Sequence, residues 1–126
     1  MANVKRVEDL IAWQRAMELA RVIYKVSASL PYSERFGLQS QIRRAAVSVP
    51  SNIAEGFGRE STTELLRFRR VARGSLFELR TQLRLSVDLS MLPSDAIPTD
   101  LVDETDRVLQ ALIRSLEAVQ ASRETR

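Results

Sequence analysis

The stretch from Gln39 to Glu60, QSQIRRAAVSVPSNIAEGFGRE, constrains the fold of this chain more than any other stretch. At about 100° per residue, its apolar residues repeat with the period of a helix. Small side chains extend the apolar stripe on one side, so that only a narrow polar stripe remains. A helix that is apolar over much of its circumference is normally buried against more than one partner. The stretch therefore predicts the central helix of an all-α bundle, with one side in contact with another subunit.

The polar stripe of this helix brings Arg44, Ser48, Asn52 and Glu55 to one side at successive turns. An enzyme would use Glu55 as a general base and Arg44 as an anion clamp, but no second carboxylate stands at helical spacing to share that work. We interpret the stripe instead as a hydrogen-bonded line within or between subunits. The same hypothesis of a structural or oligomeric contact includes the adjoining small residues Ala46, Val47 and Pro50.

Three motifs of the chain carry a family resemblance. They are DLIAWQRAMELARVIYKV, QIRRAAVSVPSNIAEGFGR and FRRVARGSLFELRTQL, which together cover roughly residues 9 to 90. In order and spacing they resemble the four-helix-bundle proteins encoded in intervening sequences of bacterial large-subunit ribosomal RNA genes. The resemblance implies a small cytosolic bundle that assembles as a ring of five, without known catalysis. The chain is also similar to accessory proteins of diversity-generating retroelements, which are pentameric bundles that bind a reverse transcriptase and nucleic acid.

The residue types that are missing narrow the chemistry. The 126 residues include neither cysteine nor histidine, so thiol chemistry, the commonest metal ligand and the usual base near neutral pH are all excluded. We therefore expect no enzyme activity, no metal and no cofactor. The N-terminal residues lack the apolar region of a signal peptide, and no apolar run is long enough to span a membrane. A soluble cytoplasmic protein is the expectation.

Periodicity along the whole chain predicts one up-and-down antiparallel four-helix bundle. The expected helices cover residues 8–29, 34–57, 62–91 and 100–121, and the tail from residue 122 to 126 should fray. Pro50 lies inside the second of these ranges and removes one backbone donor. We favour one helix kinked at Pro50, and the alternative is two helices that meet at residues 48–50.

Local signals indicate how these helices begin and end. Ser33 is the expected N-cap of the second helix, and Gly56 or Gly58 should take the left-handed conformation that ends it. Ser61 and Glu64 form a capping box, which predicts that the third helix starts at residue 62. Thr99 is the expected N-cap of the fourth helix.

Charge is distributed unevenly although the net charge is only +3. Residues 35–87 contain ten arginines against four glutamates, whereas residues 88–126 contain eight acidic residues against four arginines. At the helical period, Arg69, Arg73, Arg80 and Arg84 form a row within about 60° of the third helix. Such a row is typical of binding to nucleic-acid phosphates. The alternative is a solvated face whose arginines pair with Glu78 or with the acidic fourth helix.

A second apolar set on the third helix favours oligomerisation. Val71, Phe77, Leu85 and Leu89 lie off the core stripe, and exposed apolar groups in that number indicate a protein contact. The combined prediction is a non-enzymatic, ring-forming scaffold that holds RNA or DNA through the arginine row. The alternative function is a protein adaptor for an acidic or nucleic-acid-bound partner, such as a reverse transcriptase, without direct contact to nucleic acid.

Overall fold

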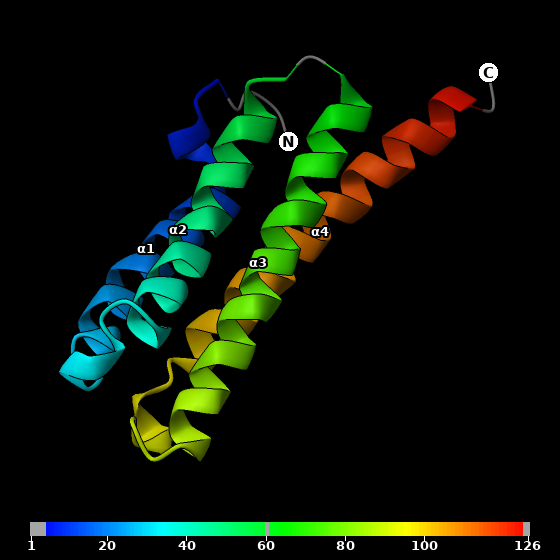
Figure 1. Ribbon diagram of the computed structural model, residues 1–126. Coiled ribbons are helices and arrows are strands. Elements are labelled where there is room, and N and C mark those ends of the chain that lie inside the picture. The colour runs from blue at the N-terminus through cyan, green and yellow to red at the C-terminus, as the bar shows by residue number, and fades with distance from the viewer. Residues whose placement is uncertain (1–4, 60, 125–126) are drawn as a thin grey trace.

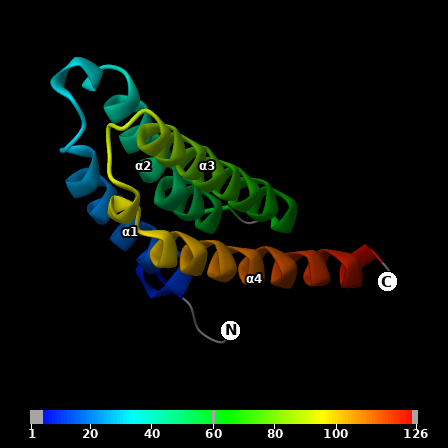
Figure 2. The ribbon, with the colours of Figure 1, turned by 90° about the horizontal axis from the view of Figure 1, so that it is seen from below.

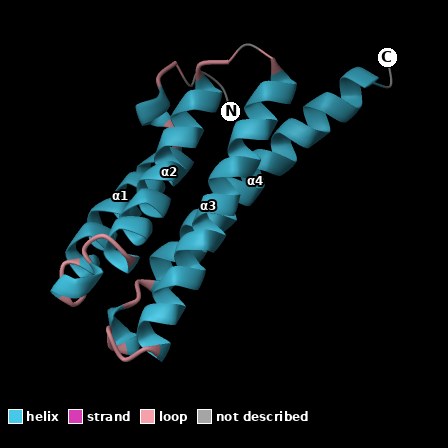
Figure 3. Cartoon of the chain, in the orientation of Figure 1, coloured by secondary structure: helices cyan, strands magenta, loops and turns pink. Residues whose placement is uncertain are grey.

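The computed structural model describes residues 5–59 and 61–124, and all regular structure in this part of the chain is helical. The four α-helices are α1 (Ile11–Ser27), α2 (Leu38–Phe57), α3 (Thr62–Asp88) and α4 (Thr99–Glu124). Three short 3-10 helices accompany them: η1 (Val7–Asp9), η2 (Tyr32–Glu34) and η3 (Ser94–Ala96). Successive helices run in alternating directions, and the loops lie at their ends (Figures 1 and 3). The prediction of an all-α fold with four helices is confirmed.

The core is built from aliphatic side chains of all four helices. The predicted α2 stripe is buried, because Ile42, Val49 and Ile53 are fully covered and Ala45 is 1% exposed. Buried residues of the other helices pack against this stripe: Ala16, Leu19 and Ile23 of α1, Ala72, Leu76, Leu79 and Leu83 of α3, and Val102 and Leu109 of α4. The spacing of three and four residues between them is what a helix needs to present one face to a core.

Helix α4 differs from the others because its buried residues end just past its midpoint. Its last buried residue is Ile113, and none of the described residues beyond it is buried. Figure 2 shows these last turns running beyond the end of α3. Helix α4 continues to Glu124, and Arg123 Nη1 donates to Thr62 Oγ1 at 2.8 Å, whereas the fraying expected from residue 122 stays a prediction. Residues 125–126 lie outside the described residues.

The beginning of α2 corrects one expected helix boundary. The predicted helix from residue 34 starts instead at Leu38, because η2 occupies Tyr32–Glu34. Ser33 lies inside η2 and makes no cap, whereas Glu34 Oε1 accepts the Leu38 N–H at 3.0 Å. The predicted cap of α3 is confirmed, since Ser61 Oγ accepts the Glu64 N–H at 3.4 Å and α3 starts at Thr62. Thr99, the predicted cap of α4, is instead the first residue of that helix, and its Oγ1 donates to the Ile97 carbonyl oxygen at 3.5 Å.

The middle and the end of α2 test the predictions made for Pro50 and for the two glycines that follow it. The helix passes through Pro50 without interruption, so the alternative of two helices is wrong. No glycine among the described residues has a positive φ, and Gly58 follows the helix with φ −78°, so the predicted left-handed end is wrong. Gly56 instead permits a close helix contact, because a Cβ at this position would lie 3.0 Å from Phe68 Cβ.

Candidate functional site

The arginine row of α3 faces acidic side chains of α4. Arg73 Nε lies 2.8 Å from Asp106 Oδ1, and Arg80 Nη2 lies 3.0 Å from Asp103 Oδ1. Arg84 Nε is paired within its own helix, 3.0 Å from Asp88 Oδ1. Pairing with the acidic fourth helix, which the sequence left as the alternative, is therefore the arrangement of the two middle arginines.

Arg69 differs from the other members of the row because it is buried. Only 5% of the residue is exposed, and its Nε atom has no hydrogen-bond partner in the structure. Desolvation by burial lowers the pKa of its guanidinium. The hypothesis that Arg69 contacts phosphate needs correction, because the helical period places it on the margin of the buried stripe rather than on a solvated face.

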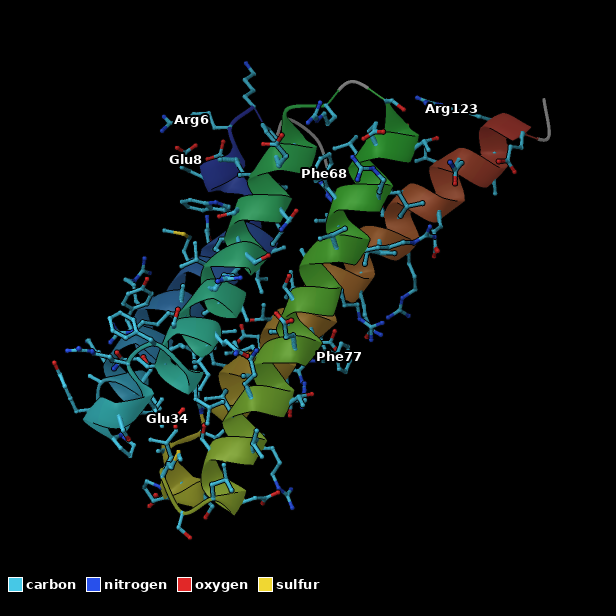
Figure 4. All side chains as sticks on the ribbon, viewed as in Figure 1. Arg6, Glu8, Glu34, Phe68, Phe77 and Arg123 are labelled. Carbon is cyan, nitrogen blue, oxygen red and sulfur yellow. The ribbon has the colours of Figure 1, made fainter. Side chains whose placement is uncertain are left out.

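Phe77 also belongs with α4 rather than with the other exposed apolar residues of α3. The guanidinium carbons of Arg73 and Arg80 lie 4.9 and 5.6 Å from the centre of its ring. Figure 4 shows Phe77 projecting from α3 on the side away from α1 and α2. The ring thus packs beside the ion pairs that join α3 to α4, although 42% of the residue remains exposed.

The polar stripe of α2 is joined within the chain. Ser48 Oγ lies 2.7 Å from Ser75 Oγ of α3, and Asn52 Nδ2 donates to Ser48 Oγ at 2.9 Å. Glu55 pairs with Arg59 at 2.7 Å. Arg44 is exposed and makes no ion pair in the described part of the chain, so the structure does not bring it to Glu55.

The small residues of α2 divide between the core and the surface. Ala46 and Pro50 are buried in the core of the single chain, which removes them from any contact with another subunit. Val47 is 41% exposed and remains available.

Three apolar side chains of α3 and its C-cap lie exposed, away from the buried stripe of the helix. Val71, Leu85 and Leu89 have exposed fractions of 44%, 45% and 52%, and we call them the α3 apolar face. At the helical period they share one side of the helix. The structure therefore leaves these three predicted contact residues accessible, in contrast to Ala46 and Pro50.

A feature that sequence reasoning missed lies where α1 turns into α2. Here Tyr24, Tyr32 and Phe36 are all exposed, Phe36 to 83%. The guanidinium carbon of Arg35 lies 4.1 Å from the ring centre of Tyr32 and 4.7 Å from that of Phe36. We call this cluster, completed by Arg43 and Arg44, the aromatic–arginine patch: Tyr24, Tyr32, Arg35, Phe36, Arg43 and Arg44. The missed signal is the loop sequence PYSERF, whose two aromatics belong to no helical stripe.

Residues 5–59 and 61–124 were also searched for metal-binding clusters and for membrane-spanning helices. No group of three or more acidic side chains is arranged there to hold a metal ion. No helix in the described chain combines the length and apolar character needed to span a bilayer.

Comparison with known protein families gives one match that covers most of the chain. A family model described as 23S rRNA-intervening sequence protein matches residues 8–114, from η1 to just past the last buried residue of α4. A comparison with curated proteins found no match.

Proposed function

Because the chain belongs to the family of 23S rRNA-intervening sequence proteins, we propose that it is a non-enzymatic cytoplasmic scaffold that assembles with copies of itself. The observation that carries the proposal is the α3 apolar face, whose three aliphatic side chains are exposed on one side of α3 and of its C-cap. Exposed apolar clusters typically mark protein contacts. The resemblance found in the sequence sets the expected assembly as a closed ring of five, which requires one repeated heterologous contact.

A scaffold agrees with the chemistry that the chain offers. The sequence has no histidine and no cysteine to act as nucleophile or base. Glu55, the carboxylate of the α2 stripe, is exposed and paired with Arg59. A ring of such chains would hold a partner, either RNA or DNA or a protein such as a reverse transcriptase.

Assembly is tested by placing a charge on the α3 apolar face. We expect light scattering of the wild-type protein to give about five times the 14.3 kDa mass of one chain, since a pentamer is proposed. Val71→Glu should give the mass of a single chain, because a carboxylate would have to be desolvated in the contact. Helicity in circular dichroism should stay unchanged.

Val119→Glu is the matched control for this experiment. Val119 is 40% exposed, close to the 44% of Val71, but lies on the last turns of α4. This variant should keep the assembled mass. A wild-type protein that is monomeric at micromolar concentration would contradict the proposal, and so would a Val71→Glu variant that assembles normally.

The arginine row has a different role in this proposal from the one that its spacing suggested. We assign Arg73 and Arg80 to holding α4 against α3, because each is within 3.0 Å of an α4 carboxylate. An arginine that already pairs with a carboxylate gains little from exchanging it for a phosphate. We therefore expect Arg73→Gln/Arg80→Gln to leave nucleic-acid affinity and its salt dependence unchanged.

The same double variant should lose about 1–2 kcal/mol of unfolding free energy, because Asp106 is partly buried and would lose its charged partner. Asp106 has a side-chain exposure of only 17%. Arg84→Gln is the control, since its pair with Asp88 is 76% and 56% exposed and should contribute under about 0.5 kcal/mol. Urea denaturation measures the unfolding free energy. Fluorescence anisotropy at two salt concentrations measures the nucleic-acid affinity and its salt dependence. If the double variant instead bound every nucleic acid more weakly and with a smaller salt slope, Arg73 and Arg80 would be phosphate-binding residues.

A further inference from the structure

The turn from α1 to α2 carries uncompensated positive charge. Between residues 21 and 47 the chain has five cationic residues and a single carboxylate, that of Glu34. The cations are Arg21, Lys25, Arg35, Arg43 and Arg44. None of them forms an ion pair with a carboxylate in the described chain. Glu34 is occupied in capping α2, and Figure 4 shows it at this end of the molecule.

This turn therefore contrasts with α3, where five arginines of the outer surface have acidic partners. Each of these five lies within 3.0 Å of a carboxylate oxygen: Arg67, Arg70, Arg73, Arg80 and Arg84. The sequence shows more arginine in α3, but the structure leaves more unneutralised charge beside α1. An anionic ligand would meet less competition at the turn.

Three exposed aromatic rings share the same surface. Tyr24 is 45% exposed, Tyr32 is 75% exposed and Phe36 is 83% exposed. The side chain of Arg35 stacks on both Tyr32 and Phe36, which leaves most of each ring open. Exposed rings beside unpaired arginines are the combination that proteins use for single-stranded nucleic acid, with bases stacked on the rings and phosphates on the cations.

We propose that the aromatic–arginine patch binds single-stranded nucleic acid. An open groove runs through the patch, with Tyr24, Arg35, Phe36, Ser40, Arg43 and Arg44 along its walls. Exposed bases of a single strand reach the rings of Tyr32 and Phe36, whereas a paired duplex keeps its base faces stacked and covered. The site is contained in one chain, so binding does not depend on the proposed assembly.

Part of the patch is held in place before a ligand arrives. Arg43 Nε donates to Ser27 Oγ at 2.8 Å, and Arg43 Nη2 donates to the Tyr24 carbonyl oxygen at 3.1 Å. Its guanidinium carbon lies 4.6 Å from the centre of the Tyr24 ring. These contacts tie α2 to α1 and fix one wall of the groove. A rigid site loses less conformational entropy when it binds.

The charge argues against a protein occupant. The centre of a protein–protein contact is depleted of charged residues, because their desolvation is costly. Burial of this patch by another subunit would desolvate Arg35 and Arg44 without a carboxylate to compensate them within the described chain. Phosphates supply the missing counter-charges and bases supply the apolar surface.

The proposal is tested by removing the flat rings while keeping their apolar character. The probes are a labelled, unstructured single strand, as RNA and as DNA, and the duplex of the same length. We expect fluorescence anisotropy to show that Tyr32→Leu/Phe36→Leu weakens single-strand binding at least about tenfold, because stacking on aromatic rings is lost. Arg44→Gln should reduce the salt slope by about 0.7, the effect of one single-strand phosphate. Binding of either the RNA or the DNA single strand in this way supports the proposal, whichever of the two has the higher affinity.

Phe77→Leu is the matched control, because Phe77 is also an exposed phenylalanine with arginines stacked on its ring. It should leave single-strand affinity unchanged. Wild-type affinity in Tyr32→Leu/Phe36→Leu would overturn the proposal, as would equal affinity for the duplex. A change of assembled mass without a change of binding would also overturn it, and would make the patch a subunit contact. Light scattering of every variant provides this last comparison.

Discussion

Ala46→Glu should prevent the chain from folding, whereas Val47→Glu should leave the fold intact. Ala46 is 1% exposed in the core, and Val47 is 41% exposed on the surface of the same helix. A glutamate at residue 46 would either bury its charge or force α2 away from its neighbours, which costs several kcal/mol. A domain of this size is stabilised by only about 5–15 kcal/mol in total, so a loss of several kcal/mol removes a large part of its stability.

Circular dichroism and urea denaturation separate the two variants. We expect Ala46→Glu to lose its helical signal or to unfold without a cooperative transition. Val47→Glu should unfold within about 0.5 kcal/mol of the wild-type protein, as exposed substitutions usually do. A cooperatively folded Ala46→Glu variant of normal stability would contradict the packing of α2 described above.

Arg69→Met should make the protein more stable. The Arg69 side chain is buried, its Nε atom has no hydrogen-bond partner, and desolvation lowers its pKa. A buried donor without a partner costs about 1–3 kcal/mol, and methionine fills a similar volume without that cost. We expect the free energy of unfolding to rise by about 1–3 kcal/mol, measured by urea denaturation.

Arg67→Met serves as the comparison for this substitution. Arg67 lies on the same helix with a side-chain exposure of 57% and pairs with Glu64 at 2.9 Å. Its replacement should change stability by no more than about 0.5 kcal/mol. A loss of stability in Arg69→Met would show that its guanidinium makes interactions that stabilise the fold.

The helices were predictable because burial repeats at the period of the helix. Ile42, Val49 and Ile53 follow this rule in α2, and the Ser61 cap marks the start of α3. The start of α2 was harder to predict. A serine before a helix is a common cap, but here the longer Glu34 side chain reaches the Leu38 N–H across the turn. The local sequence does not show which of two neighbouring side chains, Ser33 or Glu34, accepts the backbone N–H at the start of α2.

The direction of the arginine row could be predicted only in part. The helical period places Arg73 and Arg80 on one side of α3, but it does not say whether that side meets solvent or another helix. A matching signal existed in α4, where Asp103 and Asp106 stand one turn apart. In the antiparallel arrangement Arg73 meets Asp106 and Arg80 meets Asp103, so the order of the acids reverses that of the arginines. Recognising this requires knowing first that α3 and α4 pack together.

The early end of burial in α4 separates two kinds of evolutionary constraint within one helix. The buried positions of α4 are Val102, Thr105, Leu109 and Ile113, where close packing limits the volume of a substitute, and the family match ends at residue 114. In the described turns beyond it, Leu116 is half-buried against the core, and polar side chains make surface contacts to α3, such as that of Gln120 Nε2 with Thr63 Oγ1 at 3.0 Å. Substitutions at the exposed positions beyond Ile113 would change the polarity and charge of the surface without requiring compensating mutations in the core. We therefore expect the exposed positions of this segment to tolerate substitution more readily than the buried positions before it.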